Sequence, residues 1–418
     1  MNDKPSAVNH QPFPVEALRA RFPAIARAAP FVFFDNAAGA QVPDAVMAAV
    51  ADHLLMRNVQ RGGPYRQSRE VDAMIARARE SVAAFVNARG ADEIAFGLNA
   101  TSFIRSISLA VSQTLGSRPE IIVSDLDHES NIATWLALER GGARIVWWHA
   151  RVGEDGARLH PADLEPLLSE RTRIVACTIA TNATGSLVDV AEVARRAHAV
   201  GAEVFLDAVH YAPHGPIDVQ ACDCDYLVSS GYKVFAPHMG FAWCRREAIN
   251  RLPTFREDFI PDVTPDKLEA GTYAYENVAG MEAAIGYLEQ LGSGPTRTTA
   301  IRSAMTAIAA YERTLSSALL DQAATVPGLT VHGVTDRARL DERVPTLCFS
   351  VKGVESSAIA GAMAALGFGI RSGHMYSPRL LTKLGLLPGG AVRASLVHYN
   401  TIEEIARFGD ALRKTVAG

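Results

Sequence analysis

The chain has 418 residues, of which 48% are hydrophobic and 21% charged, and its formal net charge is −4. This length and composition favour one large and one smaller domain and exclude a globally disordered chain. The mild negative charge implies no basic face, so we expect neither a nucleic-acid partner nor binding to an anionic membrane.

The sequence carries no sign of export or of a membrane span. No stretch reaches the roughly 18 consecutive apolar residues that a spanning helix needs, and the first 15 residues are polar, without the apolar core of a signal peptide. The five cysteines are too few and too scattered for a disulfide framework. Cys222 and Cys224 have the wrong spacing for a zinc knuckle, so we expect no metal site. We predict a cytoplasmic protein.

The first third of the chain predicts an arm followed by a strand and several helices. Residues 1–30 read as an arm with a helix at about 15–25, and residues 31–34 as a strand. Asp35-Asn36-Ala37-Ala38-Gly39 then forms a turn of small residues that lets the backbone approach a substrate closely. Apolar spacing next predicts helices at about 43–57 and 68–85 and, after a strand at 94–96, a third helix over about 99–115.

The middle of the chain alternates between strand and helix patterns. Apolar runs predict strands at 121–124, 144–148, 174–179, 203–207, 225–229 and 241–244, the last able to pair antiparallel. Helical spacing lies between them at 132–140, 161–168 and 190–200. Continuous apolar strands with intervening helices favour a mostly parallel sheet that is covered on both faces.

The pattern changes beyond a linker at 291–295. A long helix at 297–325 is followed by strands at 329–332, 346–351, 369–371 and 392–396, and by helices at 355–366, 379–384 and after a capping box at 401–404. This α+β pattern predicts a smaller C-terminal domain. We therefore divide the chain into an arm at 1–30, a large domain at 31–290 and a small domain at 291–418.

An acid and a lysine follow two neighbouring predicted strands. Asp207 closes the apolar run 204–206, and Lys233 comes shortly after the run 226–228, through two serines and a glycine. Strand ends in an open α/β sheet deliver such residues to one crevice, where ligands bind. Pyridoxal phosphate (PLP) needs both groups: a lysine forms a Schiff base with its aldehyde, and a carboxylate keeps its pyridine nitrogen protonated. Either residue alone is more often a surface lysine or a turn residue, so the pair carries this prediction.

Several motifs extend this interpretation over the chain from about residue 30 onward. They are Asp35–Ala38, Asn58-Val-Gln-Arg-Gly62, Asp127-His128-Glu-Ser-Asn131-Ile-Ala-Thr-Trp135, Thr181–Gly185, Glu269-Ala-Gly271-Thr272, Arg371-Ser-Gly-His374, Arg393–Leu396 and Tyr399–Thr401. With these motifs the chain resembles the class V aminotransferases of the fold-type I PLP enzymes, closest to group II cysteine desulfurases and desulfurase-like proteins. The resemblance implies an aspartate aminotransferase-like large domain with a seven-stranded-type sheet.

The resemblance also implies a role for each matching residue. Lys233 would hold PLP and later move the Cα proton, Asp207 would pair with the pyridine nitrogen, and His128 would stack on the ring. The ring hydroxyl would contact Asn182, and the phosphate would be held by Ala100, Thr101 and Ser230. Thr272 would reach the phosphate of the other subunit, which implies a homodimer. On the side of an amino-acid substrate, Arg393 would bind the carboxylate through two parallel hydrogen bonds, and Asn36, Arg371 and Tyr376 would line the site.

The departures from the family pattern bear on the reaction. His210 stands where desulfurases have a glutamine beside the ring hydroxyl, and we expect it to fill that role. Desulfurases also carry a cysteine two residues after the histidine of Arg-x-Gly-His, whereas Tyr376 stands there in this chain. The nucleophile that would take up the sulfur is therefore missing from its expected place.

The chemistry that remains needs no cysteine. We expect a C–S β-elimination on a cysteine derivative, which yields aminoacrylate and then pyruvate and ammonia. The alternative is transamination, or Cα epimerisation as in isopenicillin N epimerase-like proteins. A PLP-binding protein without turnover is a third hypothesis, which the presence of both Lys233 and Arg393 disfavours.

Overall fold

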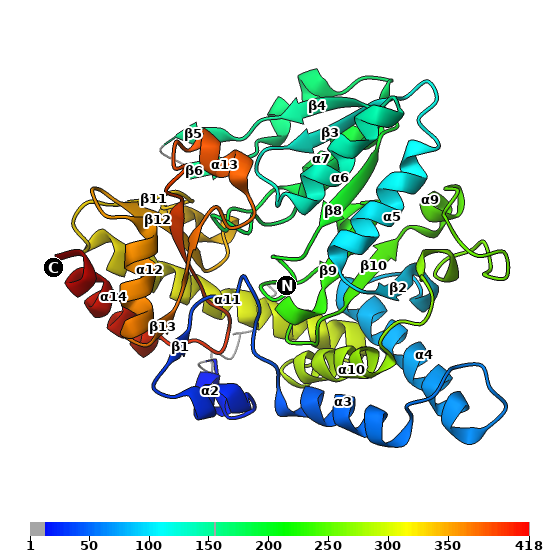
Figure 1. Cartoon of the computed structure of the whole chain (residues 1–418), viewed down its shortest axis with the longest axis horizontal. Coiled ribbons are helices and arrows are strands. Elements are labelled where there is room, and N and C mark those ends of the chain that lie inside the picture. Colours follow the sequence, from blue (N-terminus) through cyan, green and yellow to red (C-terminus); the bar gives the residue numbers. More distant parts are fainter. Residues whose placement is uncertain (1–12, 154–155, 418) are drawn as a thin grey trace, which may run out of the picture.

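The main sheet of the protein has seven strands. The computed structural model describes residues 13–153 and 156–417, and orders the strands β2-β10-β9-β8-β7-β3-β4 (Figure 1). Their bounds are Ile94–Gly97 (β2), Glu120–Ser124 (β3), Arg144–Trp148 (β4), Thr172–Thr178 (β7), Glu203–Asp207 (β8), Tyr226–Ser230 (β9) and Gly240–Cys244 (β10). β10 runs antiparallel to both of its neighbours, β2 and β9, and the other adjacent pairs of strands are parallel. The predicted α/β class with a mostly parallel seven-stranded sheet is confirmed.

The central strands are buried on both faces, which explains their continuous apolar sequences. In β8, Val204 and Leu206 pack into one apolar core, whereas Phe205 points into the core on the opposite face. Helices cover the two faces: α5 (Ala100–Ser112) and α6 (Ser130–Leu136) on the side of Phe205, and α4 (Arg66–Val86), α7 (Val190–Ala199) and α10 (Tyr275–Gln290) on the other. Alternate side chains of one strand thus fill both layers.

Helix α10 is absent from the elements that the sequence predicted. It packs against α3 (Asp44–Met56) and α4 below the sheet (Figure 1). A Cβ atom at Gly280 would lie 2.5 Å from the ring of Pro237, so this close packing needs glycine. Glycine inside a helical pattern lowers its helix propensity, and this hid the helix in the sequence.

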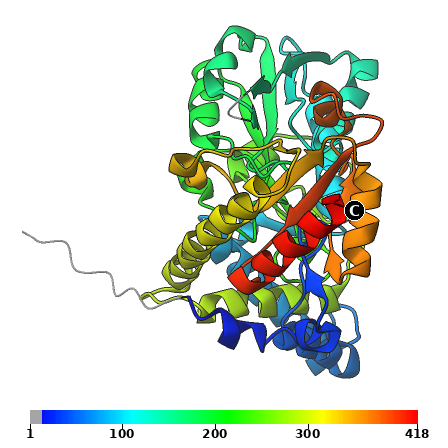
Figure 2. The same cartoon turned by 90° about the vertical axis from the view of Figure 1, so that its left-hand side faces the viewer.

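The C-terminal part forms a second sheet with helices on it. Its antiparallel strands are β11 (Leu329–Val331), β12 (Thr346–Val351), β15 (Ala391–Ser395) and β14 (Arg371–Gly373), in that order. Figure 2 shows α11 (Arg297–Ala324) beside α14 (Ile402–Ala417), and α12 (Ser356–Ala365) also packs on α14. This is the expected α+β arrangement.

The first strand joins this second sheet region and not the main sheet. β1 (Val32–Phe33) pairs parallel with β13 (Phe368–Gly369). The chain therefore enters the C-terminal part before it builds the main sheet, although the predicted division placed residues 31–34 in the large domain. The division after residue 290 stays a prediction.

Three predicted helices differ in the structure. The helix expected at 15–25 is two helices, α1 (Val15–Arg19) and α2 (Pro23–Ala28), because Phe22 is extended before a proline. The helix expected at 161–168 is two 3-10 turns, Pro161–Asp163 and Glu165–Leu167, each with a proline in its first turn. The helix expected at 132–140 is α6, and the segment Ala137–Gly141 continues it as a 3-10 helix.

The remaining short elements connect these layers. They are the hairpin β5 (Arg151–Gly153) and β6 (Gly156–Arg158), the helices α8 (Val219–Cys222), α9 (Arg246–Asn250) and α13 (Pro378–Lys383), and 3-10 turns at Ala91–Glu93, Gly231–Lys233, Asp266–Leu268 and Arg337–Glu342. Within the described part of the chain, every helix is too short or too polar to cross a membrane.

Candidate active site

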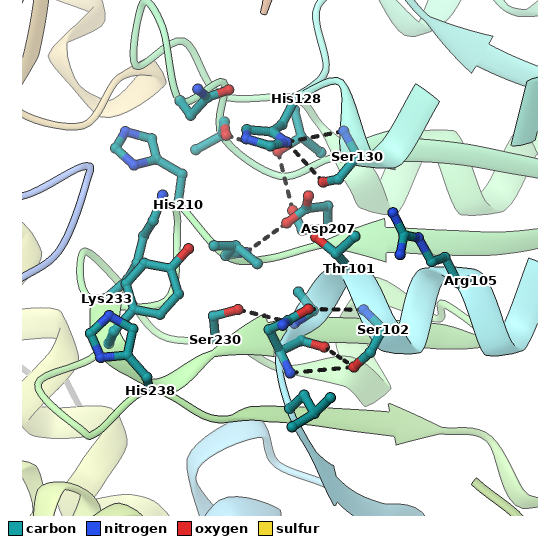
Figure 3. A pocket seen from close by; sticks show the side chains of 18 of the residues that line it. Thr101, Ser102, Arg105, His128, Ser130, Asp207, His210, Ser230, Lys233 and His238 are labelled. Atoms are coloured by element: carbon teal, nitrogen blue, oxygen red, sulfur yellow. Dashed lines mark hydrogen bonds between the residues drawn. The ribbon is translucent and has the colours of Figure 1, made fainter. Parts of the chain in front are cut away.

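A cavity of about 720 Å³ lies at the carboxyl ends of three adjacent parallel strands. Thr178, Asp207 and Ser230 end β7, β8 and β9 in turn, and all three line it. The start of α5, the turn that bears Lys233 and the loop that bears His128 close it from other sides (Figure 3). The structure thus brings the predicted residues together, and Ala100, Thr101, Asn182 and His210 line the same cavity.

The first turn of α5 forms a cradle for an anion. The side chain of Asn99 caps the helix by accepting the N–H of Ser102 at 3.0 Å, and the N–H of Ala100 donates to Ser230 Oγ at 3.1 Å. A Cβ atom at Gly240 would lie 2.5 Å from the backbone of Asn99, so glycine lets β10 support this turn closely. Backbone N–H groups and the positive end of the helix dipole suit a phosphate group.

Lys233 and Asp207 are buried in this cavity with shifted pKa values. Burial, and after it the positive charge of Arg393, lowers the pKa of Lys233 to about 7. A large share of this amine is therefore neutral near pH 7, as a nucleophile toward an aldehyde must be. Burial raises the pKa of Asp207, although the Val209 N–H, which donates to it at 2.9 Å, and Lys233 act against this. A cationic ring nitrogen is the partner that such a buried carboxylate favours.

Three hydrogen-bonded side chains, those of Asp127, Asn131 and Trp135, hold the segment that bears His128. Asn131 Nδ2 donates to Asp127 at 2.7 Å, and Trp135 Nε1 donates to Asn131 at 3.1 Å. The Ser130 N–H donates to Nδ1 of His128 at 3.1 Å. Burial, followed by the charges of Lys233 and Arg393, lowers the pKa of His128 to about 4, so the ring is neutral. The spacing Asp-x-x-x-Asn-x-x-x-Trp thus links three side chains of the segment that bears His128, whose ring is held by Ser130, a link that the sequence pattern alone did not show.

The loop at residues 372–377 is tied to the cavity by Asn182. Its side chain donates to the Met375 carbonyl at 2.6 Å and accepts from Ser377 Oγ at 2.9 Å. Met375 and Tyr376 have positive φ angles of 48° and 59°, in the left-handed region that non-glycine residues seldom adopt. The exposed ring of Tyr376 lies 5.6 Å from that of His128.

No cysteine side chain is placed to replace a loop nucleophile among the described residues that line the cavity. Cys348 is fully buried in β12, and burial raises its pKa to about 12. A thiol held in this state is protonated and unreactive near pH 7.

The two arginines predicted on the substrate side share an acid. Arg393 Nη2 lies 2.9 Å from Asp35 Oδ1, and Arg371 Nη2 lies 2.8 Å from Asp35 Oδ2. Arg393 Nη1 also donates to the Asn182 carbonyl at 2.8 Å, whereas its Nε is buried without a partner among the described residues. Sequence reasoning placed Asp35 in a turn and missed this pairing, although an acidic residue in the substrate motif was a signal for it.

Arg371, Arg393 and Tyr376 are not among the side chains that line the cavity in the described chain, and neither are two other predicted residues, Asn36 and Thr272. Asn36 is buried, and its Nδ2 donates to the carbonyl oxygens of Ser395 and Phe33, each at 2.9 Å, while its Oδ1 accepts from the Tyr399 hydroxyl. Its amide braces the first strand against β15, and its contact with substrate stays a prediction. Thr272 is exposed, with Oγ1 3.3 Å from Gln60 Oε1, and its reach into a partner's site stays a prediction as well.

The cavity matches what PLP requires: an anion cradle, a buried carboxylate, a flat neutral ring and a partly neutral lysine. Comparison with known proteins agrees, since a sequence model described as Aminotransferase class-V matches residues 32–408. The chain belongs to the class V aminotransferase family.

This class V family member aligns with its relatives over nearly its whole length. It is 35% identical to the aminotransferase-like protein FGM3 of Gibberella zeae, over 96% of this chain and 98% of that protein. It is 32% identical to a cysteine desulfurase of Enterobacter sp., over 96% of this chain and 98% of that protein. The crystal structure of the cysteine desulfurase CsdA (S-sulfonic acid) from Escherichia coli matches with a TM-score of 0.84 at 28% identity, over 97% of this chain and 99% of that chain.

These comparisons establish the cofactor and the general class of reaction. Class V aminotransferases and cysteine desulfurases depend on PLP, so this family member is a PLP-dependent enzyme, a lyase or transferase. Its fold is that of the fold-type I PLP enzymes. The loop that carries Tyr376 separates it from the desulfurase pattern.

Proposed function

We propose that the protein is a C–S lyase that removes a sulfur leaving group from the β-carbon of a cysteine derivative. The observation that carries this proposal is the loop at 372–377, where Tyr376 occupies the desulfurase cysteine position while Lys233, Asp207 and Arg393 are all retained. Elimination needs the lysine base and the carboxylate clamp but no enzyme thiol.

Each step has a residue suited to it in this proposal. When bound, PLP withdraws electrons from the substrate Cα and acidifies its proton. Ala100, Thr101 and Ser230 would hold its phosphate, His128 would stack on the ring, Asp207 would pair with the pyridine nitrogen, and Asn182 and His210 would contact the ring hydroxyl. Arg393 and Arg371 orient the substrate carboxylate, which directs the Cα proton toward Nζ of Lys233.

We further propose that the protein acts as a homodimer. Large apolar side chains are exposed at the cavity and elsewhere on the large domain, with Leu98 74%, Phe259 82% and Phe255 fully exposed. Leu98 also lines the cavity mouth, so a second copy packed there would complete the site. A monomer mass in light scattering of the PLP-loaded protein would contradict this.

A product assay in D₂O tests the reaction. The PLP-loaded protein is given L-cysteine, cystine, S-conjugates of cysteine and ordinary amino acids, and products are read by mass spectrometry, with Lys233→Ala as the inactive control. Pyruvate with a released thiol, perthiol or sulfide is the expected result. Deuterium at Cα or a new keto acid, without pyruvate from any sulfur substrate, would contradict elimination and favour epimerisation or transamination, a result in keeping with the aminotransferase-like relative.

A further inference from the structure

His210 forms part of the wall of the cofactor cavity and carries an unused nitrogen. Its side chain is 3% exposed, and its Nε2 lies 3.1 Å from Thr346 Oγ1. Its Nδ1 is buried and has no hydrogen-bond partner among the described residues. Figure 3 shows the imidazole next to the end of Lys233. Burial, followed by the charges of His214, Lys233 and Arg393, keeps the pKa of His210 well below its ordinary value, which favours the neutral ring and leaves its unpartnered Nδ1 able to accept a proton.

A second imidazole stands behind the first. His214 lies four residues further along the turn after β8, and the ring centroids of His210 and His214 are 5.3 Å apart at an interplanar angle of 74°. This T-shaped contact sets the edge of one imidazole against the other ring. The two rings are neighbours, and the path proposed below requires a side-chain rotation that brings a nitrogen of each into hydrogen-bond contact.

Glu312, from another part of the fold, is the third residue of a row that begins with His210 and His214. Glu312 in α11 places Oε2 2.7 Å from Nδ1 of His214, and both side chains are 3% exposed. Burial raises the pKa of Glu312 well above its ordinary value and lowers the pKa of His214 to about 3. Burial thus favours the neutral form of both groups, in which the carboxyl O–H of Glu312 would donate to Nδ1 of His214.

This pair opens on a second cavity. A space of about 250 Å³ is lined by His214 and Glu312 and reaches the surface at Arg313 and Asp341, whose side chains are exposed. The other titratable groups that face it are Tyr211 and Arg343. His210 lines the cofactor cavity and His214 lines this second one, so the two imidazoles form the wall between them.

We propose that Glu312, His214 and His210 form a proton path between solvent in the second cavity and the base in the cofactor cavity. Glu312 gives its carboxyl proton to Nδ1 of His214, His214 releases the proton of its other ring nitrogen to the unpartnered Nδ1 of His210, and His210, once its Nε2 leaves Thr346, releases the Nε2 proton into the cofactor cavity. Glu312 is left as a carboxylate and regains one proton from water, so charge and protons balance. The direction reverses when Lys233 has a proton to lose, and this link to catalysis rests on the proposed function.

Proton exchange in the cofactor-free protein tests the path without turnover. Proteins with ¹⁵N-labelled histidine are compared by NMR, and the His210 N–H signal is assigned by its loss in His210→Gln. In Glu312→Gln the amide still donates to His214 but holds no proton to transfer. We expect the His210 N–H lifetime against exchange with water to lengthen by about 100-fold, the lower end of the effect of a positioned proton-transfer group. His214→Gln interrupts the same path and should act alike.

A matched control separates the path from a loss of packing. His53 is 2% exposed in α3 and lines a separate cavity with Arg57 and Glu282, so His53→Gln should leave the His210 N–H lifetime unchanged. An unchanged lifetime in both Glu312→Gln and His214→Gln, with the proteins folded, would overturn the proposal. An equal lengthening in His53→Gln would also overturn it, because the effect would then be structural.

The loaded enzyme gives a second readout. In D₂O, substrate recovered from the wild type should carry solvent deuterium at Cα. Substrate recovered from Glu312→Gln should keep more of its original Cα hydrogen, because the proton on Lys233 exchanges slowly with solvent. Equal deuterium incorporation in the two proteins would contradict the link to Lys233. If no amino acid exchanges its Cα proton even in wild type while the NMR result holds, the proposed function fails and the path stands.

Discussion

Asp35 Oδ1 lies 2.9 Å from Nη2 of Arg393, the guanidinium expected to bind the substrate carboxylate. Since Asp35 also binds Arg371 at 2.8 Å, one carboxylate sits between two arginines and leaves the cluster with a single net positive charge. That balance suits a substrate with one carboxylate, which must share Arg393 with Asp35. The second N–H groups of Nη1 and Nη2 of Arg393, together with its Nε, which has no partner in the described chain, are the donors left for it.

The first prediction concerns the charge of Asp35. In Asp35→Asn the shape of the side chain stays and its negative charge is lost, so a substrate carboxylate no longer competes with a neighbouring anion. We expect the Kd of an unreactive amino-acid carboxylate to fall by about tenfold, while kcat falls because Arg371 and Arg393 lose their fixed positions. Spectroscopic titration measures the first effect and steady-state kinetics the second.

A surface pair provides the control for this charge change. Asp163→Asn removes an equal charge from the exposed pair with Arg151 and should change neither quantity. Weaker binding of the carboxylate in Asp35→Asn would show that Asp35 assists the clamp and does not compete with the substrate.

Arg393→Ala should weaken substrate binding by about 2–4 kcal/mol, because it leaves a substrate carboxylate without its charged partner. Arg393→Lys should recover little of this loss, because a single ammonium cannot reach Asp35 and the Asn182 carbonyl while also presenting a second donor. Unaltered KM and kcat in Arg393→Ala would remove Arg393 from the site.

The sequence predicted the parts of the site that local patterns determine. Apolar runs defined β8 and β9, and residues at the ends of adjacent parallel strands must lie near one another, so Asp207 and Lys233 could be paired from the amino-acid sequence alone. The anion cradle at Ala100 followed from the small residues at the start of a helix. Each of these inferences depends on a few consecutive residues.

The missed features depend on contacts between distant segments. Asp35 and Arg393 are 358 residues apart and meet only because the end of β1 lies beside β15. His214 and Glu312, 98 residues apart, meet because α11 crosses behind the turn after β8. No periodicity encodes such pairs, and burial, which sets their pKa values, is a property of the whole packed chain.

Lys233→Met tests both the lysine assignment and its buried state. The variant should lack the visible band at about 420 nm, which in wild type shifts on borohydride reduction, as expected of a lysine Schiff base with PLP. The folded-state pKa of Lys233 is about 7 and its ordinary pKa is 10.5, so the unfolded chain binds more protons between these limits and wild-type stability rises with pH there.

The stability measurement uses cofactor-free protein. Below pH 7 Lys233→Met should be more stable than wild type by about 2–4 kcal/mol, since it buries a similar shape without the cost of a buried amine, and the difference should shrink as pH approaches 10.5. Urea unfolding at several pH values checks this. A 420 nm band retained in Lys233→Met would contradict the assignment of Lys233 as the Schiff-base lysine. A stability difference that grows with pH would contradict the lowered pKa of Lys233.

Asp127→Asn should flatten the pH dependence of stability. Burial raises the pKa of Asp127 from 3.8 to about 8, although hydrogen bonds with Ser124 and Asn131 act against it. Between these values the folded state holds a proton that the unfolded state has lost, so the free energy of unfolding falls as pH rises, by at most about 1.4 kcal/mol per pH unit. The asparagine amide keeps both hydrogen bonds and does not titrate, so the variant should gain about 2–3 kcal/mol over wild type from pH 5 to pH 8 in urea unfolding. Parallel pH profiles for the two proteins would show that Asp127 is ionised in its buried place at the head of the three hydrogen-bonded side chains that hold the segment bearing His128.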